Sequence, residues 1–302
     1  MTTLSRRAFL AAAAASPLAA GTARAIPPLE RVNPRITGLG LTAYSLKPHM
    51  RWWQGKETTG KLTVLDFLDY CAKLGLEAAE LTSYFFEAPV KREHLAEIRR
   101  RAHLLGLHVS GGAMANNFTH PPGSDEAKSQ LAYFREWLDH FADVGAAVVR
   151  VFAGNPPKGV TEGDAVKNVL ANLGEALPYA EKRGVMLGME NHDLVKNIDL
   201  LEKIVKAVDS RWFGVVWDSA NLAPTPDPYA DLARIAPYAL VAQAKVMTRV
   251  NGKDVPADFA KLVKILRDAK FAGPLVFEYE EREDPLAAIP RYVKLLRGAL
   301  GT

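Results

Sequence analysis

Polar side chains with oxygen or nitrogen donors stand at the ends of four consecutive apolar stretches in the second half of the sequence. The stretches read GVMLGMEN, FGVVWDS, ALVAQAKV and GPLVFEYE. If they are β-strands, side chains two residues apart share a face. The polar residues that would then face the same side are, in chain order, Glu190 with His192, Asp218, Gln243 with Lys245, and Glu278 with Glu280.

These residue types favour the chemistry of a divalent metal ion. Burying three carboxylates together is costly unless a cation compensates their charge. A ligand set of Glu190, Asp218, Gln243 and Glu278 supplies only oxygen atoms, which suits Mn²⁺ or Mg²⁺, with Co²⁺ as a further possibility. For one such residue alone, a helix cap, a surface pair or a buried salt bridge is the simpler interpretation. Four in succession favour a metal site.

A regular alternation of strands and helices has to position these side chains. Apolar runs alternate with amphipathic stretches, and glycine separates many of them, as in KLGLEAAE, DVGAAVVR and KRGVMLG. Such a glycine is typical of a helix end that leads into a buried strand. Eight strand–helix units without a linker predict an α/β fold, a (β/α)8 TIM barrel. The expected helices are 61–74, 91–105, 125–144, 162–183, 197–208, 229–236, 256–270 and 285–299.

A doubly wound open sheet is the alternative fold. Its dinucleotide-binding version is disfavoured because no GxGxxG motif leads from the first strand into a helix. In a barrel, functional residues lie at the carboxyl ends of the strands. The barrel therefore predicts that the polar residues described above meet in one site.

The first 25 residues have the features of a bacterial export signal. Twin arginines, Arg6 and Arg7, precede an alanine-rich apolar run and an A-x-A cleavage site that ends at Ala25. The apolar run is short for a membrane span. We therefore expect twin-arginine export to the periplasm, cleavage after Ala25, no stable membrane anchor, and a single domain of residues 26–302.

Charge and cysteine content argue against several classes of protein. The formal net charge is +4, and loss of the three arginines among residues 1–25, which include no acidic residue, lowers it to +1. A nearly neutral chain has no electrostatic reason to bind nucleic acid, so a nuclease is a remote interpretation. Cys71 is the only cysteine. An internal disulfide and a cysteine-ligated metal are therefore excluded.

The same four stretches carry a resemblance to a known family. GMENH, VVWDSAN, VAQAKV and LVFEYE are similar to the xylose isomerase-like TIM-barrel superfamily, which includes the sugar phosphate isomerase/epimerase family and has Glu, Asp, His-or-Gln and Glu on strands 5 to 8. Gln243 stands where many members have histidine, and Asn221 stands where epimerases and endonucleases often have it. TSYFF, MANNFTHPPG and EYEEREDPLAAIPRYVKLLR resemble an exported subgroup.

The resemblance implies a divalent-metal-dependent carbohydrate isomerase or epimerase, which abstracts a proton next to a carbonyl through a metal-stabilised enolate. Glu190 and Glu278 would be ligands and acid/base groups. His192 would donate to the developing oxyanion or to a leaving group, and Lys245 would add positive charge. If a β-substituent leaves instead, the same site acts as a lyase or hydratase on 3-keto-glycosides. A non-catalytic periplasmic sugar-binding protein is the remaining alternative.

The first half of the chain adds three candidates for contact with a carbohydrate substrate. Glu80, at the end of the second strand, is expected either to bind sugar hydroxyls or to pair with Arg150 inside the barrel. Asn116 and Asn117 follow the third strand and are expected to bind hydroxyls or to act as ordinary turn residues. The full expected substrate-binding set is Glu80, Asn116, Asn117, Asn221 and Glu280. The sequence leaves the oligomeric state open.

Overall fold

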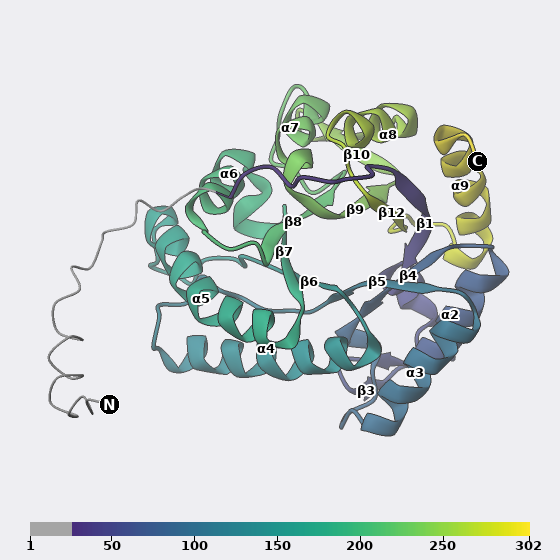
Figure 1. Ribbon diagram of the computed structural model, residues 1–302, viewed down its shortest axis with the longest axis horizontal. Coiled ribbons are helices and arrows are strands. Elements are labelled where there is room, and N and C mark those ends of the chain that lie inside the picture. Colours follow the sequence, from purple (N-terminus) through teal and green to yellow (C-terminus); the bar gives the residue numbers. More distant parts are fainter. Residues whose placement is uncertain (1–25) are drawn as a thin grey trace, which may run out of the picture.

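A closed barrel of eight parallel strands forms the centre of the protein (Figure 1). The computed structural model describes residues 26–302, so the export signal predicted for residues 1–25 lies outside the described part. Each barrel strand pairs in parallel with both neighbours, and the last closes onto the first. In ring order the strands are β1 (Ile36–Thr42), β4 (Ala78–Thr82), β5 (His108–Ala113), β6 (Val148–Val151), β7 (Met186–Glu190), β8 (Phe213–Asp218), β9 (Ala239–Lys245) and β12 (Gly273–Glu278).

A ring of α-helices covers the outside of the barrel, as Figure 1 shows. All eight helices expected from the sequence are present, and their ends differ from the expected ones by three residues at most. The prediction of a (β/α)8 TIM barrel is confirmed. The helices are α2 (Val64–Lys73), α3 (Arg92–Leu104), α4 (Asp125–Val144), α5 (Glu162–Arg183), α6 (Ile198–Ala207), α7 (Pro228–Ile235), α8 (Phe259–Asp268) and α9 (Pro285–Leu300).

Local sequence signals explain where these helices begin and end. Asp227 and Asp284 each accept hydrogen bonds from the first backbone N–H groups of α7 and α9, and each is followed by a proline at the first helical position. Gly145 and Gly184 end α4 and α5 with φ of +89° and +69°, a conformation that favours glycine. The glycines before strands therefore act as helix caps, as the sequence predicts.

The barrel interior is built in two layers that differ in polarity. The lower layer contains four buried valines, Val148, Val216, Val241 and Val276. Two residues further along the same four strands, and thus on the same face, stand Arg150, Asp218, Gln243 and Glu278. The apolar layer closes the floor, so the polar layer lies toward the carboxyl ends of the strands.

On β7 the lower layer has a glycine instead of a valine. A Cβ atom at Gly188 would lie 2.6 Å from Cγ2 of Val216, so no larger residue fits beside that valine. Two residues after Gly188, Glu190 joins the polar layer. Gly188 therefore leaves room for Val216 in the apolar layer, and Glu190 keeps its place in the polar layer.

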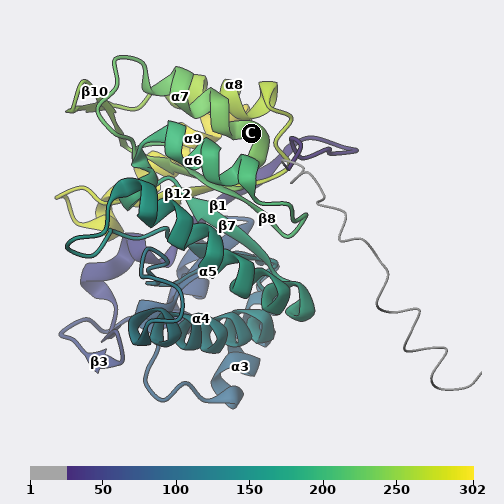
Figure 2. The same ribbon diagram turned by 90° about the vertical axis from the view of Figure 1, so that its left-hand side faces the viewer.

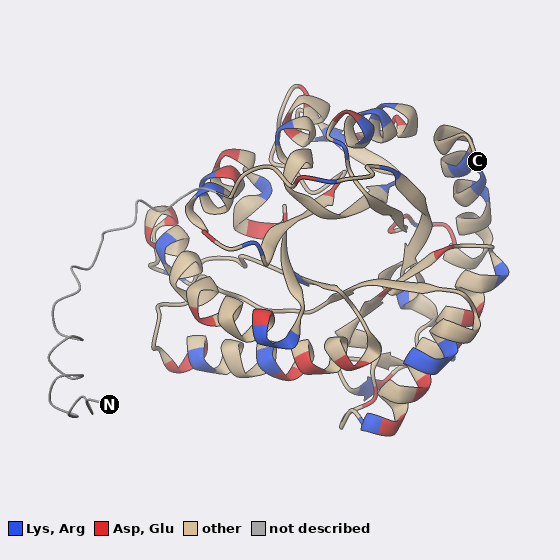
Figure 3. Cartoon of the chain, viewed as in Figure 1, with Lys and Arg blue, Asp and Glu red and all other residues tan. Residues whose placement is uncertain are grey.

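Two short hairpins extend the loops at the mouth of the barrel. They are β2–β3 (Trp52–Trp53 with Lys56–Glu57) and β10–β11 (Met247–Val250 with Lys253–Pro256), and both lie on the left in Figure 2. Figure 3, in which charged residues are coloured on the ribbon, shows Lys, Arg, Asp and Glu along the outer helices and loops. Among residues 26–302, no helix is long and apolar enough to cross a membrane.

Candidate active site

A cavity of about 200 Å³ opens at the carboxyl ends of the barrel strands, and we call it the main cavity. Nine of the eleven site residues predicted from the sequence meet there. Asp218 is fully buried beside the cavity, where it contacts Lys245 and Asn221. The other eight line the cavity itself: Glu80, Glu190, His192, Asn221, Gln243, Lys245, Glu278 and Glu280.

The structure does not bring Asn116 and Asn117 to the main cavity. Nδ2 of Asn116 donates to the carbonyl of Phe152 at 2.8 Å, and its Oδ1 accepts from the N–H of the same residue at 2.9 Å. Nδ2 of Asn117 donates to the carbonyl of Asn155 at 2.9 Å, and its Oδ1 accepts from Oγ1 of Thr119. Both side chains thus join the loop after β5 to the loop after β6. Loop structure, the alternative interpretation, accounts for their contacts.

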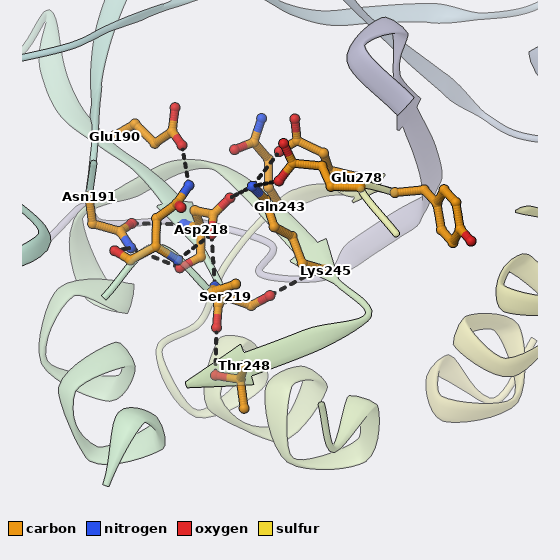
Figure 4. Close-up of polar contacts among 12 residues, drawn as sticks. Glu190, Asn191, Asp218, Ser219, Gln243, Lys245, Thr248 and Glu278 are labelled. Atoms are coloured by element: carbon orange, nitrogen blue, oxygen red, sulfur yellow. Dashed lines mark hydrogen bonds and ion pairs between the residues drawn. The ribbon is translucent and has the colours of Figure 1, made fainter. Parts of the chain in front are cut away.

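The ammonium group of Lys245 lies among the carboxylates that the sequence assigns to a metal ion (Figure 4). Nζ is 3.4 Å from Oδ2 of Asp218, 3.3 Å from Oε2 of Glu278 and 2.5 Å from Oε2 of Glu280. Burial lowers the pKa of Lys245, but the surrounding carboxylates outweigh burial and raise the pKa well above its ordinary value. Lys245 is therefore a buried cation that neutralises part of this cluster.

Glu190 is held by two donors from neighbouring parts of the barrel. Its Oε2 accepts from Nη1 of Arg150 at 2.6 Å, and its Oε1 accepts from Nδ2 of Asn221 at 2.8 Å. Burial raises the pKa of Glu190, but the charges of Arg150, His192 and Lys245 outweigh burial and bring the pKa below its ordinary value. Glu190 is therefore an ionised carboxylate inside the barrel.

The sequence suggests Arg150 only as one of two alternative partners of Glu80, the other being sugar hydroxyls. Arg150 pairs with Glu190 instead, and its guanidinium lies 3.9 Å from the centre of the Phe152 ring. The available signal was its position on β6, two residues after Val148 and on the same inward face. An arginine at that position can pair with any carboxylate of the polar layer within reach of its long side chain, so its position alone does not predict its partner.

Glu80 takes part in the site through Gln243. Oε1 of Glu80 accepts from Nε2 of Gln243 at 2.7 Å, and both side chains are buried. Burial is the main reason that the pKa of Glu80 is raised to about 7. Because the amide nitrogen faces Glu80, Oε1 of Gln243 points elsewhere and is buried without a hydrogen-bond donor.

Asp218 and Glu278 complete the polar layer. Oδ1 of Asp218 accepts from the backbone N–H groups of Ala220 and Asn221, both at 2.8 Å, whereas its buried Oδ2 forms no hydrogen bond and has only the ion pair with Lys245. Burial raises the pKa of Asp218 and raises the pKa of Glu278 to about 8. Asn191, shown in Figure 4, bonds the backbone of Asp218 in both directions and so fixes the end of β8.

The donor set fits a hard divalent cation, although the side chains are not arranged around one. Two predicted ligands, Asp218 and Gln243, each present a buried oxygen without a hydrogen bond, although that of Asp218 is ion-paired with Lys245, and such oxygens suit Mn²⁺ or Mg²⁺. Within the described part of the chain, no three His, Cys, Asp or Glu side chains form a metal-ready cluster. Lys245 forms ion pairs with Asp218 and Glu278, and Arg150 forms one with Glu190. Binding of an ion here would require the ammonium of Lys245 to move away from Asp218 and Glu278.

Aromatic side chains shape the walls of the main cavity. The ring of His192 lies against Phe152, with ring centres 4.7 Å apart, and its Nδ1 is 3.0 Å from Oδ1 of Asp193. On another wall, Tyr44 and Tyr84 pack edge to face, with ring centres 6.2 Å apart. An apolar wall beside polar groups suits a sugar ring, which has both kinds of surface.

The family of the chain follows from a match over most of its sequence. The family model described as xylose isomerase-like TIM barrel matches residues 68–298. The chain belongs to this family. No protein with a curated description matches the sequence significantly.

Solved structures of the xylose isomerase-like fold superpose on almost the whole described chain. A protein from Sinorhizobium meliloti 1021 has a TM-score of 0.69 at 18% identity, with 88% of this chain and 99% of that chain covered. A 3-keto-D-glucoside 4-epimerase from E. coli has a TM-score of 0.68 at 14% identity, with 87% and 100% covered. The IolI protein, solved with a zinc atom, has a TM-score of 0.68 at 14% identity, with 87% and 96% covered. At these identities, the likeness is one of fold.

Proposed function

We propose that this xylose isomerase-like barrel is a divalent-metal-dependent carbohydrate isomerase or epimerase. In this proposal it moves a proton on the carbon next to a substrate carbonyl. One observation carries the proposal: Glu190 and Glu278, from strands β7 and β12, line a single cavity with the buried ammonium of Lys245. Carboxylates placed around one substrate carbon are what removal and return of a proton require. The epimerase from E. coli and the zinc atom in IolI add support by analogy.

Each residue of the site has a distinct task in this mechanism. Arg150 and Asn221 hold the Glu190 carboxylate in place, so that it meets the α-hydrogen of the sugar in a fixed orientation. Glu278 exchanges the proton from its own side of the cavity, and Lys245 balances the negative charge that develops on the substrate oxygen. A divalent ion held by Glu190, Asp218, Gln243 and Glu278 would draw electrons from the carbonyl and make the neighbouring hydrogen acidic.

Proton NMR in D₂O tests the proposal directly. Purified protein loaded with Mn²⁺ or Mg²⁺ is mixed with ketoses and 3-keto-glucosides, and we expect deuterium to enter next to the carbonyl while every other bond stays intact. Glu190→Gln and Glu278→Gln should each abolish the exchange and keep the circular dichroism of the wild type. Glu175→Gln, on the exposed face of α5, is the matched control and should keep the rate. A glutamate variant that retains most of the rate removes that residue from the mechanism.

A lyase or hydratase acting on 3-keto-glycosides is the second candidate, because a further cavity adjoins the main one and leaves space for an aglycone. Loss of the proton at C2 followed by departure of the C1 substituent would give this reaction. In the same NMR experiment, the free aglycone or a new double bond would then appear together with the deuterium. Release of the aglycone therefore distinguishes the two candidates.

We also propose that the protein is exported to the periplasm by the twin-arginine route. Support comes from the arginine pair, the apolar run and the cleavage motif among residues 1–25. Cell fractionation with N-terminal sequencing tests this: the periplasmic protein should begin at Ile26. A cytosolic protein that begins at Met1 or Thr2 would contradict it.

A further inference from the structure

A second cavity adjoins the main cavity beneath the β10–β11 hairpin, and we call it the side cavity. Its volume is about 320 Å³, against about 200 Å³ for the main cavity. The two cavities share Asn221, Lys245 and Glu280 as a common wall. Sites for organic ligands have volumes of roughly 300–1,000 Å³, a range that the main cavity reaches only together with the side cavity.

Hydrogen bonds tie the end of β9 and the β10–β11 hairpin, on one side of the side cavity, to the loop after β8. Thr248 donates through Oγ1 to the carbonyl of Ser219 at 3.0 Å, and the backbone N–H of Lys245 donates to Oγ of the same serine at 2.8 Å (Figure 4). The tip of the hairpin is fixed by the N–H of Asn251, which donates to the carbonyl of Thr225 at 2.7 Å. The space is therefore a built part of the fold, since these bonds fix the hairpin relative to the loop after β8.

The charges around the side cavity cancel. Three cationic and three anionic side chains line it: Lys196, Lys245, Arg249, Asp254, Glu280 and Glu281. Arg249 already pairs with Asp254 at 2.8 Å, and Lys245 already pairs with Glu280. Of the other two charged residues, Lys196 is cationic and Glu281 is anionic, so the remaining charges also balance. A phosphate or carboxylate group is recognised by an excess of cations that are free to bind it, which this lining does not have. A balanced, polar lining next to Leu222 and Met247 suits instead an uncharged group with several hydroxyls and an apolar face.

We propose that the side cavity binds a second, uncharged sugar unit of the substrate, while the reacting sugar lies in the main cavity. The substrate class is then an oxidised disaccharide or a comparable glycoside, not a free or phosphorylated monosaccharide. The assignment rests on the proposed function for the chemistry of the reacting unit. The wall shared by Asn221, Lys245 and Glu280 stands where the linkage between the two units passes, so these side chains can bond the linking oxygen and its neighbouring hydroxyls.

Binding measurements on the full chain test the proposal without relying on turnover. Isothermal titration compares 3-keto-cellobiose, which has two units, with methyl 3-keto-glucoside, which has one, and with its 6-phosphate. We expect the disaccharide to bind at least about tenfold more tightly than the methyl glycoside. A tenfold difference in Kd corresponds to about 1.4 kcal/mol of binding free energy. Equal affinity of the two, no binding of either, or tightest binding of the phosphate would overturn the proposal.

A variant that fills the side cavity locates the effect. Met247 lines the side cavity but not the main one, and it is only half buried on an outer hairpin. Met247→Trp should lower the affinity for the disaccharide to that for the methyl glycoside. The affinity for the methyl glycoside itself should not change. Leu104→Trp, on an exposed position of α3, adds the same side chain elsewhere and should change neither affinity. Equal weakening of both ligands by Met247→Trp would contradict the assignment.

The outcome separates this inference from the proposed function. If the disaccharide binds selectively and Met247→Trp removes the selectivity, but no sugar exchanges deuterium in D₂O, the proposed reaction is wrong and the side cavity is still a sugar site. If methyl 3-keto-glucoside exchanges deuterium and binds as tightly as the disaccharide, the reaction stands and the side cavity is not a sugar site.

Discussion

Replacing Lys245 by methionine tests whether its ammonium compensates the charge of the buried carboxylates. Oxygen atoms of Asp218, Glu278 and Glu280 lie within 3.4 Å of Nζ. At an effective dielectric constant of about 20, one such pair has a gross Coulomb energy of about 5 kcal/mol. Removing one partner of a buried pair costs about 3–5 kcal/mol net. We therefore expect the metal-free variant to lose about 3–5 kcal/mol in its free energy of unfolding, which lowers Tm by roughly 10 °C.

The free energy of unfolding that Lys245→Met loses relative to the wild type should increase at alkaline pH. Burial is the main reason that the pKa of Glu278 is about 8 in the folded protein, above its ordinary value of 4.5. A group whose pKa is higher in the folded state binds its proton more tightly there, so its contribution to stability falls as the pH rises from 4.5 to about 8. Lys245 lowers the pKa of Glu278. In the variant without Lys245 that pKa is higher, so the contribution of Glu278 to stability continues to fall at higher pH. The difference in stability between variant and wild type should therefore be larger at pH ~9 than at pH ~6.

Denaturant unfolding at both pH values, with chelator and with Mn²⁺, measures this difference. Mn²⁺ should stabilise the variant more than the wild type, because the ion meets no competing ammonium group. Lys264→Met is the matched control: Lys264 forms an exposed pair with Asp268 on α8 and should contribute little. If Lys245→Met is as stable as the wild type in chelator at pH ~9, the ammonium does not compensate these carboxylates. If Mn²⁺ stabilises neither protein, the metal site is wrong.

Two further substitutions test the support of the site and the packing of the barrel. Glu80→Ala removes the acceptor that orients the amide of Gln243, and it should weaken Mn²⁺ binding about 10- to 100-fold in isothermal titration; unchanged affinity would show that the amide needs no such support. Gly112→Ala would place a Cβ 2.3 Å from the ring of Phe141, and it should cost about 1–3 kcal/mol in thermal unfolding. Gly163→Ala, with no atom within 4 Å of its Cβ, is the control and should cost nothing; equal Tm values for the two variants would refute the clash.

The barrel could be predicted because its signals are local in the sequence. A glycine with positive φ marks the end of α4 and the end of α5, and a mostly buried strand of four or five residues follows each one. Period-two alternation also gives the layers: on β8 and β12, Val216 and Val276 stand two residues before Asp218 and Glu278. Neither signal depends on which strands become neighbours, so both can be read from a single sequence.

The pairing of the polar side chains could not be predicted, because it depends on distances between strands and on rotamers. Arg150 on β6 pairs with Glu190 on the neighbouring strand β7, whereas the sequence suggests Glu80 on β4 as its partner, as one of two alternatives for that carboxylate. Long side chains such as Lys245 and Arg150 can reach several carboxylates from one inward position. The loop asparagines show the same limit, since Asn116 bonds a backbone group 36 residues away. Alternation along a strand predicts the face of a side chain but not its partner.

Gln243 shows why such a partner matters for the choice of metal. An amide carries both an acceptor and a donor, and it can bind a cation only if its oxygen faces the site. Glu80, which is 163 residues away in the sequence, accepts from the amide nitrogen and so turns the oxygen away from itself. A histidine at this position would offer nitrogen, which suits zinc, whereas an oriented amide keeps the donor set all oxygen and favours Mn²⁺ or Mg²⁺. In the proposed metal site, the oxygen that β9 offers therefore depends on a carboxylate of β4, so Glu80→Ala should weaken the binding of a hard ion by letting the amide turn its nitrogen toward the site.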